Sequence, residues 1–490
     1  MIAACFGAVA SRRPQASAVI DGTVRLTYGR LAAMQERLAA YIAESLAQPR
    51  GARIALVLPN CWEFAACFLA AARVGALCAP LPPQWKAREL GRCLEELDPD
   101  MVVSHSALAG PWHDDCYRTQ RRLLLVDQEP IFRILLDSAP SAEVPPSLPR
   151  GPFADDVLCL ATSGSTGRPK FVVRTQRSLV AGARMVALSL GLREGCRFLS
   201  VIPFHHANGF SNCLLLPLFA GGTAVLVRRF APQRLAALAV EEKVQVLIGS
   251  PFIFRMLLEA GIGRGTFDSV EICLSSGAAM SREFAATCRD RLGLRVRQLY
   301  GSTETGTVAI EPEEGTPVQG SVGRPLESVA VKIVDAVGRE LPPGTVGEIA
   351  VRSPAMMRGL YEDVRAGKPS PADEFLRTGD LGRIDPGGNL VLCGRIKRIV
   401  NLEGVKVDPA EVERVLGRLE GITDCVVGPS CDRDGRETLK AVVAARPGCG
   451  LTRAAVIAHC RKFLAEFKIP RIIELVDELP GNIMGKRTVD

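Results

Sequence analysis

The chain has 490 residues, of which 47% are apolar and 23% charged, and its formal net charge is +7. This is the composition of a globular protein long enough for more than one domain, and it argues against a disordered chain. The basic residues are scattered without a block of five or more. A mixed solvated surface is therefore favoured over a basic funnel for an anionic substrate, and we expect no nucleic-acid partner.

The 16 cysteines form no Cys-x-x-Cys pair, and several stand in apolar runs, among them Cys61, Cys67 and Cys78. This pattern predicts small buried side chains in a reducing compartment and disfavours a disulfide framework or a zinc site. The N-terminal residues lack the basic start of a signal peptide and predict an ordinary helix. The most apolar stretch, residues 212–227, is short and is interrupted by Pro217. We therefore expect a cytoplasmic protein without membrane insertion.

The first 300 residues alternate β-rich runs with helical patterns. A buried strand is expected at residues 53–59, followed by a helix at residues 60–75 with Asn60 as its N-cap and Gly75 as its end. The same unit recurs, with helices expected at residues 232–242, 251–260 and 281–292. This succession of strand, helix and strand predicts parallel sheets that are covered by helices.

From about residue 318 the pattern changes to short strands between glycine and proline turns, at residues 328–335, 347–353 and 388–394. These predict a small antiparallel sheet or β-barrel-like subdomain. A helix with Asp408 as cap and Pro409 in its first turn opens a further mixed segment. We expect an α/β protein with a large N-terminal domain, residues 1–394, and a small α+β C-terminal domain, residues 395–490.

Three polar turns carry residues suited to nucleotide chemistry. "LATSGSTGRPK", residues 160–170, has the glycines, hydroxyls and lysine of a phosphate-holding loop, but Phe171 stands where the common nucleotide hydrolases place a hydroxyl for magnesium. "QLYGSTETG", residues 298–306, offers Thr303 to a phosphate oxygen and Glu304 to a magnesium ion. In "LRTGDLGRID", residues 376–385, Asp380 is suited to two ribose hydroxyls. Each could be a plain surface turn, but three with complementary roles in one chain favour function.

These turns, with "GRIKRIVNLEGVKVDPAEVE" at residues 394–413 and "GNIMGK" at residues 481–486, resemble the adenylate-forming superfamily of acyl-CoA synthetases, standalone adenylation domains and luciferase-like enzymes. The resemblance extends along nearly the whole chain. It implies that a carboxylate attacks the α-phosphate of ATP to give acyl-AMP and pyrophosphate, and that a thiol then displaces AMP. It also implies that the C-terminal domain is a mobile lid that rotates between two catalytic positions, with Lys397 at the hinge.

The resemblance implies the following site residues. The catalytic ones are Lys486, Glu304, Thr303 and His206, of which Glu304 also holds magnesium and Lys486 bridges the carboxylate and the α-phosphate. The phosphate loop comprises Thr162, Ser163, Gly164, Ser165, Thr166, Gly167 and Lys170. The remaining nucleotide and thiol contacts are Gly277, Ala278, Ala279, Tyr300, Gly301, Asp380, Arg395 and Gly404. Phe171, Gln176 and the wording of the final motif depart from the family pattern, but none of these changes removes a reacting group.

The loop "PFHHANGF", residues 203–210, is expected to line the acyl site, with His206 as a gate. Ala207 stands where amino-acid activators carry an aspartate, so a buried ammonium would be left unpaired and an α-amino acid is disfavoured. Ala207 also gives an ortho-hydroxyl no partner, which makes a salicylate-type acid less favoured. We expect an aryl or medium-chain acid. The expected cofactors are ATP, Mg²⁺ and CoA. The main alternative acceptor is the phosphopantetheine arm of an acyl carrier protein, and a remote alternative is a non-catalytic nucleotide- or acyl-binding protein.

Overall fold

A computed structural model describes residues 1–109, 121–128, 153, 155–162, 170–278, 280–313, 320–368, 370, 374–395, 400–402, 405–407, 409–431, 437–446, 448–477 and 479. Internal contacts divide the chain into two units. The first unit comprises Met1–Pro83, Leu97–Ala161 and Phe171–Gly394, and the second comprises Gln84–Glu96, Thr162–Lys170 and Arg395–Asp490.

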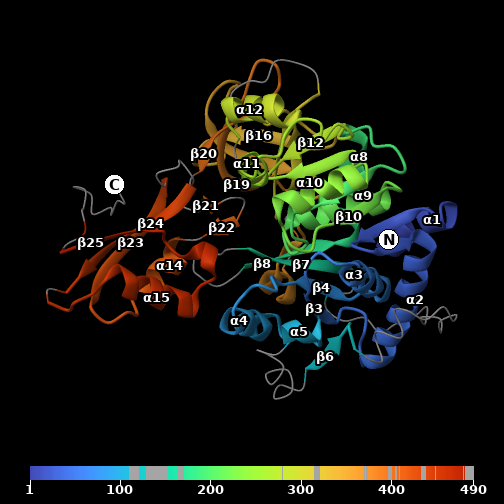
Figure 1. The fold of residues 1–490 in the computed structure, drawn as a ribbon, viewed down its shortest axis with the longest axis horizontal. Helices are drawn as coiled ribbons and strands as arrows, with labels where there is room; N and C mark the ends of the chain where they lie inside the picture. Colours follow the sequence, from blue (N-terminus) through green and yellow to red (C-terminus); the bar gives the residue numbers. More distant parts are fainter. Residues whose placement is uncertain are drawn as a thin grey trace. The chain divides into compact units, whose positions relative to one another are not determined.

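The largest sheet has nine strands, and its central strands run parallel (Figure 1). In spatial order they are β15 (Arg324–Pro325), β14 (Gly306–Ile310), β13 (Val296–Ser302), β12 (Ile272–Ser275), β11 (Val246–Gly249), β9 (Arg197–Ser200), β10 (Thr223–Leu226), β1 (Ser17–Asp21) and β2 (Val24–Thr27). The helices in the same region of the chain are α8 (Gln176–Ser189), the π-helix η1 (Gly209–Leu215), α9 (Leu216–Phe219), α10 (Pro232–Glu241), α11 (Pro251–Glu259) and α12 (Arg282–Leu292).

A second sheet has seven strands, in the order β18 (Gly359–Leu360), β8 (Lys170–Thr175), β7 (Asp156–Thr162), β4 (Leu77–Pro80), β3 (Arg53–Val57), β5 (Met101–Ser104) and β6 (Arg122–Leu125). Strands β3, β4, β5, β6 and β7 pair in parallel. The N-terminal helices are α1 (Ile2–Arg12), α2 (Tyr28–Ser45), α3 (Trp62–Val74), α4 (Ala87–Leu97) and α5 (Ser106–Ala109), and α13 (Tyr361–Arg365) follows β18. The predicted parallel sheets with helical connections are thus confirmed.

A third sheet contains β16 (Ala330–Val334), β17 (Gly347–Arg352), β19 (Leu376–Ile384) and β20 (Leu390–Arg395). Strand β17 pairs antiparallel with both β16 and β19. This is the small antiparallel element that the change of pattern after residue 318 predicts.

The second unit contains an α+β arrangement. Strand β23 (Ile422–Cys431) pairs antiparallel with β24 (Glu437–Ala445), which pairs in parallel with β25 (Ile472–Val476). The unit also contains the hairpin β21 (Val400–Leu402) and β22 (Val405–Val407), helices α14 (Pro409–Leu416) and α15 (Arg453–Phe463), and the 3₁₀ turn η3 (Glu466–Lys468). Helix α14 has Pro409 as its first residue, as predicted, whereas Asp408 lies outside the described residues.

Separate apolar cores hold these elements. In the first unit, leucines of α10 and α11 pack against β10, β11 and β12, represented by Leu235, Leu257, Val225, Leu247 and Cys273. In the second unit, α14 and α15 pack on β23 and β24 through a core that includes Val412, Val456 and Val443. Burial of apolar surface stabilises each core by roughly 25 cal/mol per Å². The predicted helical stripe of Val412, Val415 and Leu416 is part of this core.

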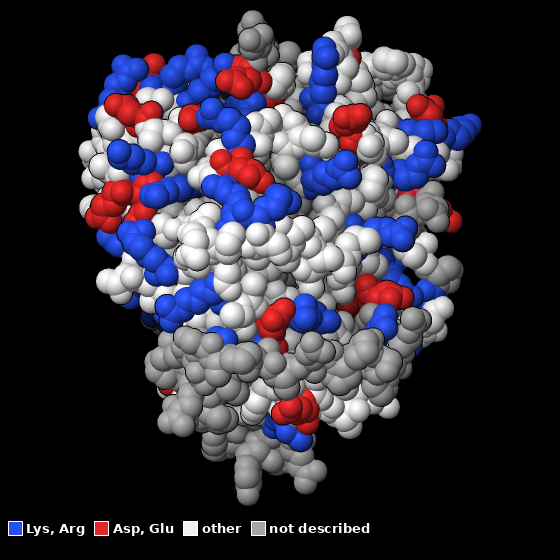
Figure 2. Space-filling view, turned by 90° about the vertical axis from the view of Figure 1, so that its right-hand side faces the viewer, with Lys and Arg blue, Asp and Glu red and all other residues white. Residues whose placement is uncertain are grey.

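The surface agrees with the scattered charge pattern of the sequence. On the face shown in Figure 2, lysine and arginine side chains are intermingled with aspartate and glutamate side chains. No helix in the described part of the chain combines the length and the apolar character that crossing a bilayer requires.

One predicted cap was wrong. Helix α3 begins after Cys61, not Asn60, and ends at Gly75, whose φ is 80°. The Asn60 amide instead donates to the carbonyls of Ser200 and Ile202 and accepts from the amide of Phe204, at 3.2, 2.9 and 2.8 Å. A side chain that satisfies three main-chain groups of a distant loop is not available as a helix cap.

Candidate active site

Predicted site residues gather at one edge of the nine-stranded sheet. Strands β9, β11, β12 and β13 are neighbours and run parallel, so their carboxyl ends meet at the same edge. His206 follows β9, Gly277 and Ala278 follow β12, and Tyr300 lies near the end of β13. In open α/β sheets this edge is where ligands bind.

Two residues from separate motifs are in direct contact. The Tyr300 hydroxyl donates to Asp380 Oδ2 at 2.7 Å, and both side chains are buried. The Asp380 amide donates to Thr378 Oγ1 at 3.1 Å, while Thr378 Oγ1 donates to the Ile349 carbonyl at 2.9 Å. Asp380 follows Gly379, whose φ of 77° suits glycine, and the Gly379 amide donates to Glu348 Oε1 at 3.0 Å. The third sheet thus fixes Asp380 against the end of β13.

The turn between β13 and β14 carries Thr303 and Glu304. Ser302 and Thr305 bond one another reciprocally, amide to hydroxyl, at 3.1 Å in each direction. Gly301 is required here because a Cβ would lie 2.3 Å from the Gly306 carbonyl oxygen. The main chain of the turn is also held from outside, because Met357 N donates to the Glu304 carbonyl at 2.7 Å. The turn therefore presents the partly exposed Glu304 side chain from a fixed backbone.

Arg174 is a supporting residue that sequence reasoning missed. Its fully buried guanidinium donates to the carbonyls of Thr303, at 3.2 Å, and of Ala355, and to Ser178 Oγ at 3.3 Å. Burial lowers the pKa of Arg174 to about 10, although Glu304 raises it, so the group stays charged at neutral pH. No local pattern marks Arg174, because its carbonyl partners lie 129 and 181 positions away.

The predicted adenine wall lies at the end of β12. Gly277 has a φ of 92°, a conformation that favours glycine. Ser275, just before it, is 1% exposed, and its hydroxyl has no hydrogen-bond partner among the described residues. A buried polar atom without a partner is costly, so this hydroxyl fits a place beside a polar ligand. A nucleotide base and ribose would supply such a ligand next to Tyr300 and Asp380.

The histidine loop is closely packed. The rings of His205 and His206 lie 4.5 Å apart, and burial together with His206 holds the pKa of His205 well below its usual range. His205 is therefore neutral at physiological pH.

The π-helix η1 begins at Gly209, and Phe210 is its second residue. A Cβ on Gly209 would lie 2.1 Å from the Pro203 carbonyl oxygen. π-helical turns are frequent at functional sites. Phe210 itself packs edge-on against Phe68, with ring centroids 4.6 Å apart.

Asn212 extends from η1 to the neighbouring strand. Its amide donates to Asn208 Oδ1 at 2.8 Å and to the buried hydroxyl of Thr307 on β14 at 3.4 Å. The histidine loop and the strand after the Glu304 turn are therefore joined by one polar chain.

The predicted phosphate loop is described only at its ends. Thr162 Oγ1 donates to the Lys170 carbonyl at 3.1 Å, where β7 ends and β8 begins. The predicted site residues outside the described part of the chain are Ser163, Gly164, Ser165, Thr166, Gly167, Ala279, Gly404 and Lys486, together with the side chain of Arg395. Their assignments stay predictions. Gln176, where the family often has histidine, accepts from the N-terminal ammonium at 2.9 Å and from the Ile2 amide at 3.0 Å.

Known proteins are similar to this chain in both sequence and fold. Residues 6–361 match the AMP-binding enzyme family, and residues 411–486 match the AMP-binding enzyme C-terminal domain. A feruloyl-CoA synthase from Amycolatopsis sp is 30% identical, over 96% of this chain and 94% of the relative. An indoleacetate–CoA ligase from Aromatoleum aromaticum is 29% identical, over 94% and 91%.

Two solved structures extend the comparison. The amide bond synthetase McbA from Marinactinospora thermotolerans has a TM-score of 0.87 and 27% identity, and the alignment covers 99% of this chain and 97% of that one. An o-succinylbenzoate CoA synthetase from Bacillus subtilis has a TM-score of 0.85 and 25% identity over the same shares. The expectations of the α/β fold and of an AMP-forming ligase of the acyl-CoA synthetase type are confirmed. The chain belongs to the AMP-binding enzyme family, within the adenylate-forming superfamily.

Proposed function

We propose that this chain joins an aryl or medium-chain carboxylic acid to AMP, with release of pyrophosphate, and then transfers the acyl group to the thiol of CoA. The observation that carries the nucleotide step is the hydrogen bond from Tyr300 to Asp380, next to the turn of Thr303 and Glu304. Residues from two motifs that the sequence assigns to adenosine are in contact, and the turn with the predicted α-phosphate contact, Thr303, follows directly after β13, the strand that carries Tyr300.

The described residues have separable tasks in this step. Asp380 would accept from the ribose hydroxyls while Tyr300 orients it. Thr303 would donate to the α-phosphate, and Glu304 would hold magnesium, which commonly binds through one or two carboxylates and substrate phosphates. When bound, the metal supplies positive charge against the phosphate oxygens. Lys486 would offset the repulsion between the carboxylate and the α-phosphate.

The choice of acid rests on the histidine loop. His205 is neutral, and Ala207 provides no carboxylate for an α-ammonium, so a charged amino group would be buried without a partner. Among the relatives, the names indoleacetate, feruloyl and o-succinylbenzoate all denote aryl acids. These names support an aryl acid for this chain as a proposal.

The acceptor has one further candidate. McbA, which shares the fold over nearly the full length, is an amide bond synthetase. An amine could therefore replace the thiol as the nucleophile toward acyl-AMP. A carrier-protein phosphopantetheine arm presents the same thiol as CoA and is the other alternative.

The test is pyrophosphate release with ATP, magnesium and a panel of indoleacetate, ferulate, octanoate and phenylalanine. We expect release with an aryl or medium-chain acid and none above background with phenylalanine. Each active acid is then supplied with CoA, a phosphopantetheinylated carrier protein or a primary amine, and the acyl product is identified by mass spectrometry. A CoA thioester as the main product supports the proposal. An amide or a carrier-protein thioester as the main product would mean that an amine or a carrier protein, and not CoA, is the acyl acceptor.

Two variants tie the activity to the site. Asp380→Asn and Tyr300→Phe should raise the KM for ATP by about tenfold or more, because each removes a charged or hydroxyl contact worth on the order of 1–3 kcal/mol. Tyr361→Phe is the matched control, because the Tyr361 hydroxyl is also buried and donates to the Leu97 carbonyl at 2.9 Å, away from the predicted residues. Nucleotide binding by the wild type without pyrophosphate release for any acid would instead indicate a non-catalytic binding protein.

A further inference from the structure

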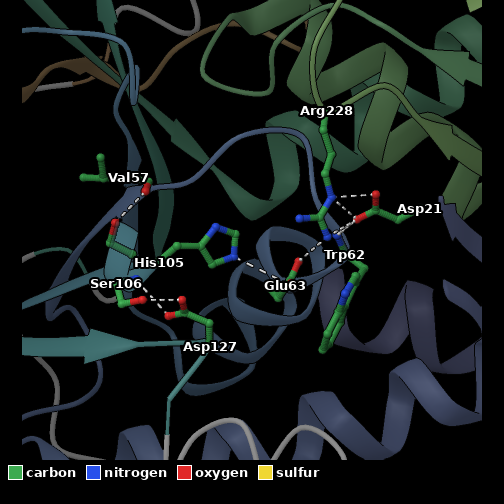
Figure 3. A network of polar contacts seen from close by, with 9 residues as sticks. Asp21, Val57, Trp62, Glu63, His105, Ser106, Asp127 and Arg228 are labelled. Carbon is green, nitrogen blue, oxygen red and sulfur yellow. Dashed lines mark hydrogen bonds and ion pairs between the residues drawn. The ribbon is translucent and has the colours of Figure 1, made fainter. Parts of the chain in front are cut away.

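A second group of potential metal ligands lies in the first unit. Cys61, Glu63 and His105 bring one thiol, one carboxylate and one imidazole together, and their ligand atoms all lie within 4.8 Å of one another. Glu63 and His105 are part of the polar network in Figure 3. Cys61 immediately precedes helix α3, Glu63 lies in its first turn, and His105 follows the end of β5. None of the three belongs to the predicted nucleotide or acyl residues.

The main chain on both sides of His105 is anchored. Ser104 Oγ donates to the Val57 carbonyl at 3.0 Å, and Val57 and Ser104 are register partners of the paired strands β3 and β5. On the other side, the amide and hydroxyl of Ser106 donate to the Asp127 carboxylate at 2.8 and 2.6 Å (Figure 3). His105 is thus positioned by two strands of the seven-stranded sheet.

The imidazole faces the carboxylate. His105 Nε2 lies 3.7 Å from Glu63 Oε1, and these side chains are 14% and 11% exposed. Cys61 is fully buried, and burial together with the adjacent Glu63 raises the pKa of its thiol well above the usual range.

Arg228 lies beside Glu63 but is bound mainly to Asp21. Its guanidinium contacts both oxygens of Asp21 at 2.7–3.0 Å and reaches Glu63 Oε2 only at 3.4 Å. Asp21 also accepts from the first amide of α3, Trp62 N, at 3.1 Å. Asp21 and Glu63 therefore share one guanidinium, so these three side chains together carry one more negative than positive charge. A thiolate and a carboxylate in the Cys61–Glu63–His105 group would carry the two negative charges that one divalent cation neutralises.

We propose that Cys61 Sγ, Glu63 and His105 Nε2 form a zinc site, with a water molecule as fourth ligand. A mixed set of thiolate, imidazole and carboxylate suits Zn²⁺ and not the oxygen-preferring Mg²⁺ or Ca²⁺. On binding, the thiol of Cys61 loses its proton to solvent, the sulfur donates an electron pair to zinc, and the oxidation state of neither changes. Tetrahedral zinc places its ligand atoms roughly 3.5 Å apart, so the group contracts by about 1 Å through side-chain rotation.

The consequence is structural. Zinc would add a metal bridge between the start of α3 and the end of β5, which His105 and Glu63 already bring into contact. The site is distinct from the magnesium ligand proposed at Glu304. Sequence spacing does not reveal it, because His105 lies 42 positions after Glu63 and no Cys-x-x-Cys pair is present.

The experiment uses the full chain and the metal ions alone. Zinc content is measured after purification without chelator. The protein is then freed of metal, confirmed as folded by circular dichroism, and titrated with Co²⁺. We expect one equivalent of zinc, and one equivalent of Co²⁺ that gives a thiolate-to-cobalt charge-transfer band in the near ultraviolet. Added Zn²⁺ should displace the cobalt and abolish the band.

Two variants assign the ligands. Cys61→Ser should abolish the charge-transfer band, and His105→Gln should weaken Co²⁺ binding by about tenfold or more. Cys78→Ala is the matched control, since it removes another buried thiol of the first unit, on strand β4, and should keep the band. The wild-type titration stands even where a variant fails to fold. Absence of a one-to-one Zn²⁺ or Co²⁺ complex in the wild type, or a band that survives in folded Cys61→Ser, overturns the proposal.

Discussion

At the scale of single residues, Arg174 connects the fold to the proposed chemistry. It is among the largest fully buried side chains, and it donates to Ser178 Oγ and to the main-chain carbonyls of Thr303, in the Glu304 turn, and of Ala355. A buried guanidinium that satisfies carbonyls fixes their positions, and its removal leaves these carbonyls without donors. Arg174 touches no predicted substrate atom, so its role is that of a positioning residue.

Arg174→Met is expected to lower kcat for pyrophosphate release by up to about 100-fold, because a shift of the Thr303 main chain misplaces the α-phosphate contact. Arg174→Lys, which can keep one of the carbonyl bonds, should recover part of the loss. The control is Arg339→Met, which removes an exposed arginine paired with Asp335 and should change nothing. Initial rates at saturating and limiting ATP separate kcat from KM. Equal kcat in folded Arg174→Met and wild type would remove the positioning role.

Asp156 gives a pH dependence at the same scale. It begins β7, is fully buried, and accepts from Arg358 at 3.0 Å. Burial raises its pKa to about 6, and the ion pair with Arg358 offsets only part of this rise. A raised carboxyl pKa means that the folded chain holds the proton more tightly than the unfolded chain. The stabilising contribution is therefore full below the unfolded pKa and is lost as the pH rises through about 6.

Asp156→Asn should remove this dependence, because the amide does not titrate. As the pH rises from about 4 to about 7, the free energy of unfolding of the variant should increase relative to that of the wild type. Urea unfolding midpoints of both proteins across this range measure the difference. Parallel pH profiles for the two proteins would show that Asp156 titrates alike in the folded and unfolded chains.

At the scale of elements, the turn between β13 and β14 depends on close backbone approach. Gly301→Ala would place a Cβ 2.3 Å from the Gly306 carbonyl oxygen, which a rigid main chain cannot avoid cheaply. We expect a loss of about 1–3 kcal/mol in stability from overpacking and a loss of most adenylation activity as Thr303 and Glu304 shift. Gly7→Ala is the control, since a Cβ on Gly7 of α1 would meet no atom within 4 Å. Thermal unfolding and pyrophosphate release are the measurements, and unchanged activity in folded Gly301→Ala would contradict the expectation.

The elements that the sequence predicts well are those with a strong local pattern. The helix expected at residues 281–292 is found as α12, Arg282–Leu292, where Ser281 is the N-cap that accepts from the Phe284 amide and Gly293, with a φ of 76°, follows the last turn. What the sequence does not predict depends on distant partners. The sequence around Asn60 is typical of a helix cap. In the structure its side chain instead forms hydrogen bonds with a loop more than 140 positions away, which only the tertiary structure brings close. No period in the sequence marks the π-helix η1, which begins at Gly209, where the main chain packs closely against the Pro203 carbonyl.

The candidate site shows the same limit. Tyr300, Asp380 and the Glu304 turn were predicted because short polar motifs in the sequence carry their own signal. Tyr300 and the turn lie at the end of β13, whereas Asp380 lies on β19 of the third sheet, and the hydrogen bond between Tyr300 and Asp380 joins the two sheets. Arg174, Ser275 and the Cys61–Glu63–His105 group lack a spacing rule, since each is defined by what surrounds it in space.

At the scale of the whole molecule, the two units have separate apolar cores, which is the physical basis for treating them as bodies that can be perturbed separately. The expected boundary between residues 394 and 395 and the rotation of the C-terminal domain stay predictions. They imply a division of labour, because a residue of the C-terminal domain can serve adenylation without serving thioester formation.

Lys486 is the residue on which that division can be measured. Its ammonium is proposed to oppose the repulsion between two anions, the carboxylate and the α-phosphate, and this repulsion exists only during adenylation. Lys486→Ala should therefore slow acyl-AMP formation by roughly 100- to 1,000-fold, the effect of removing about 3–4 kcal/mol of charge stabilisation. Thioester formation from supplied acyl-AMP and CoA should stay within a few-fold of wild type. Lys462→Ala, an exposed lysine of α15, is the control and should leave both steps unchanged. Pyrophosphate release and thioester yield from synthetic acyl-AMP measure the two steps separately. Equal losses in both would mean that Lys486 supports the C-terminal domain as a whole and is not specific to the adenylation step.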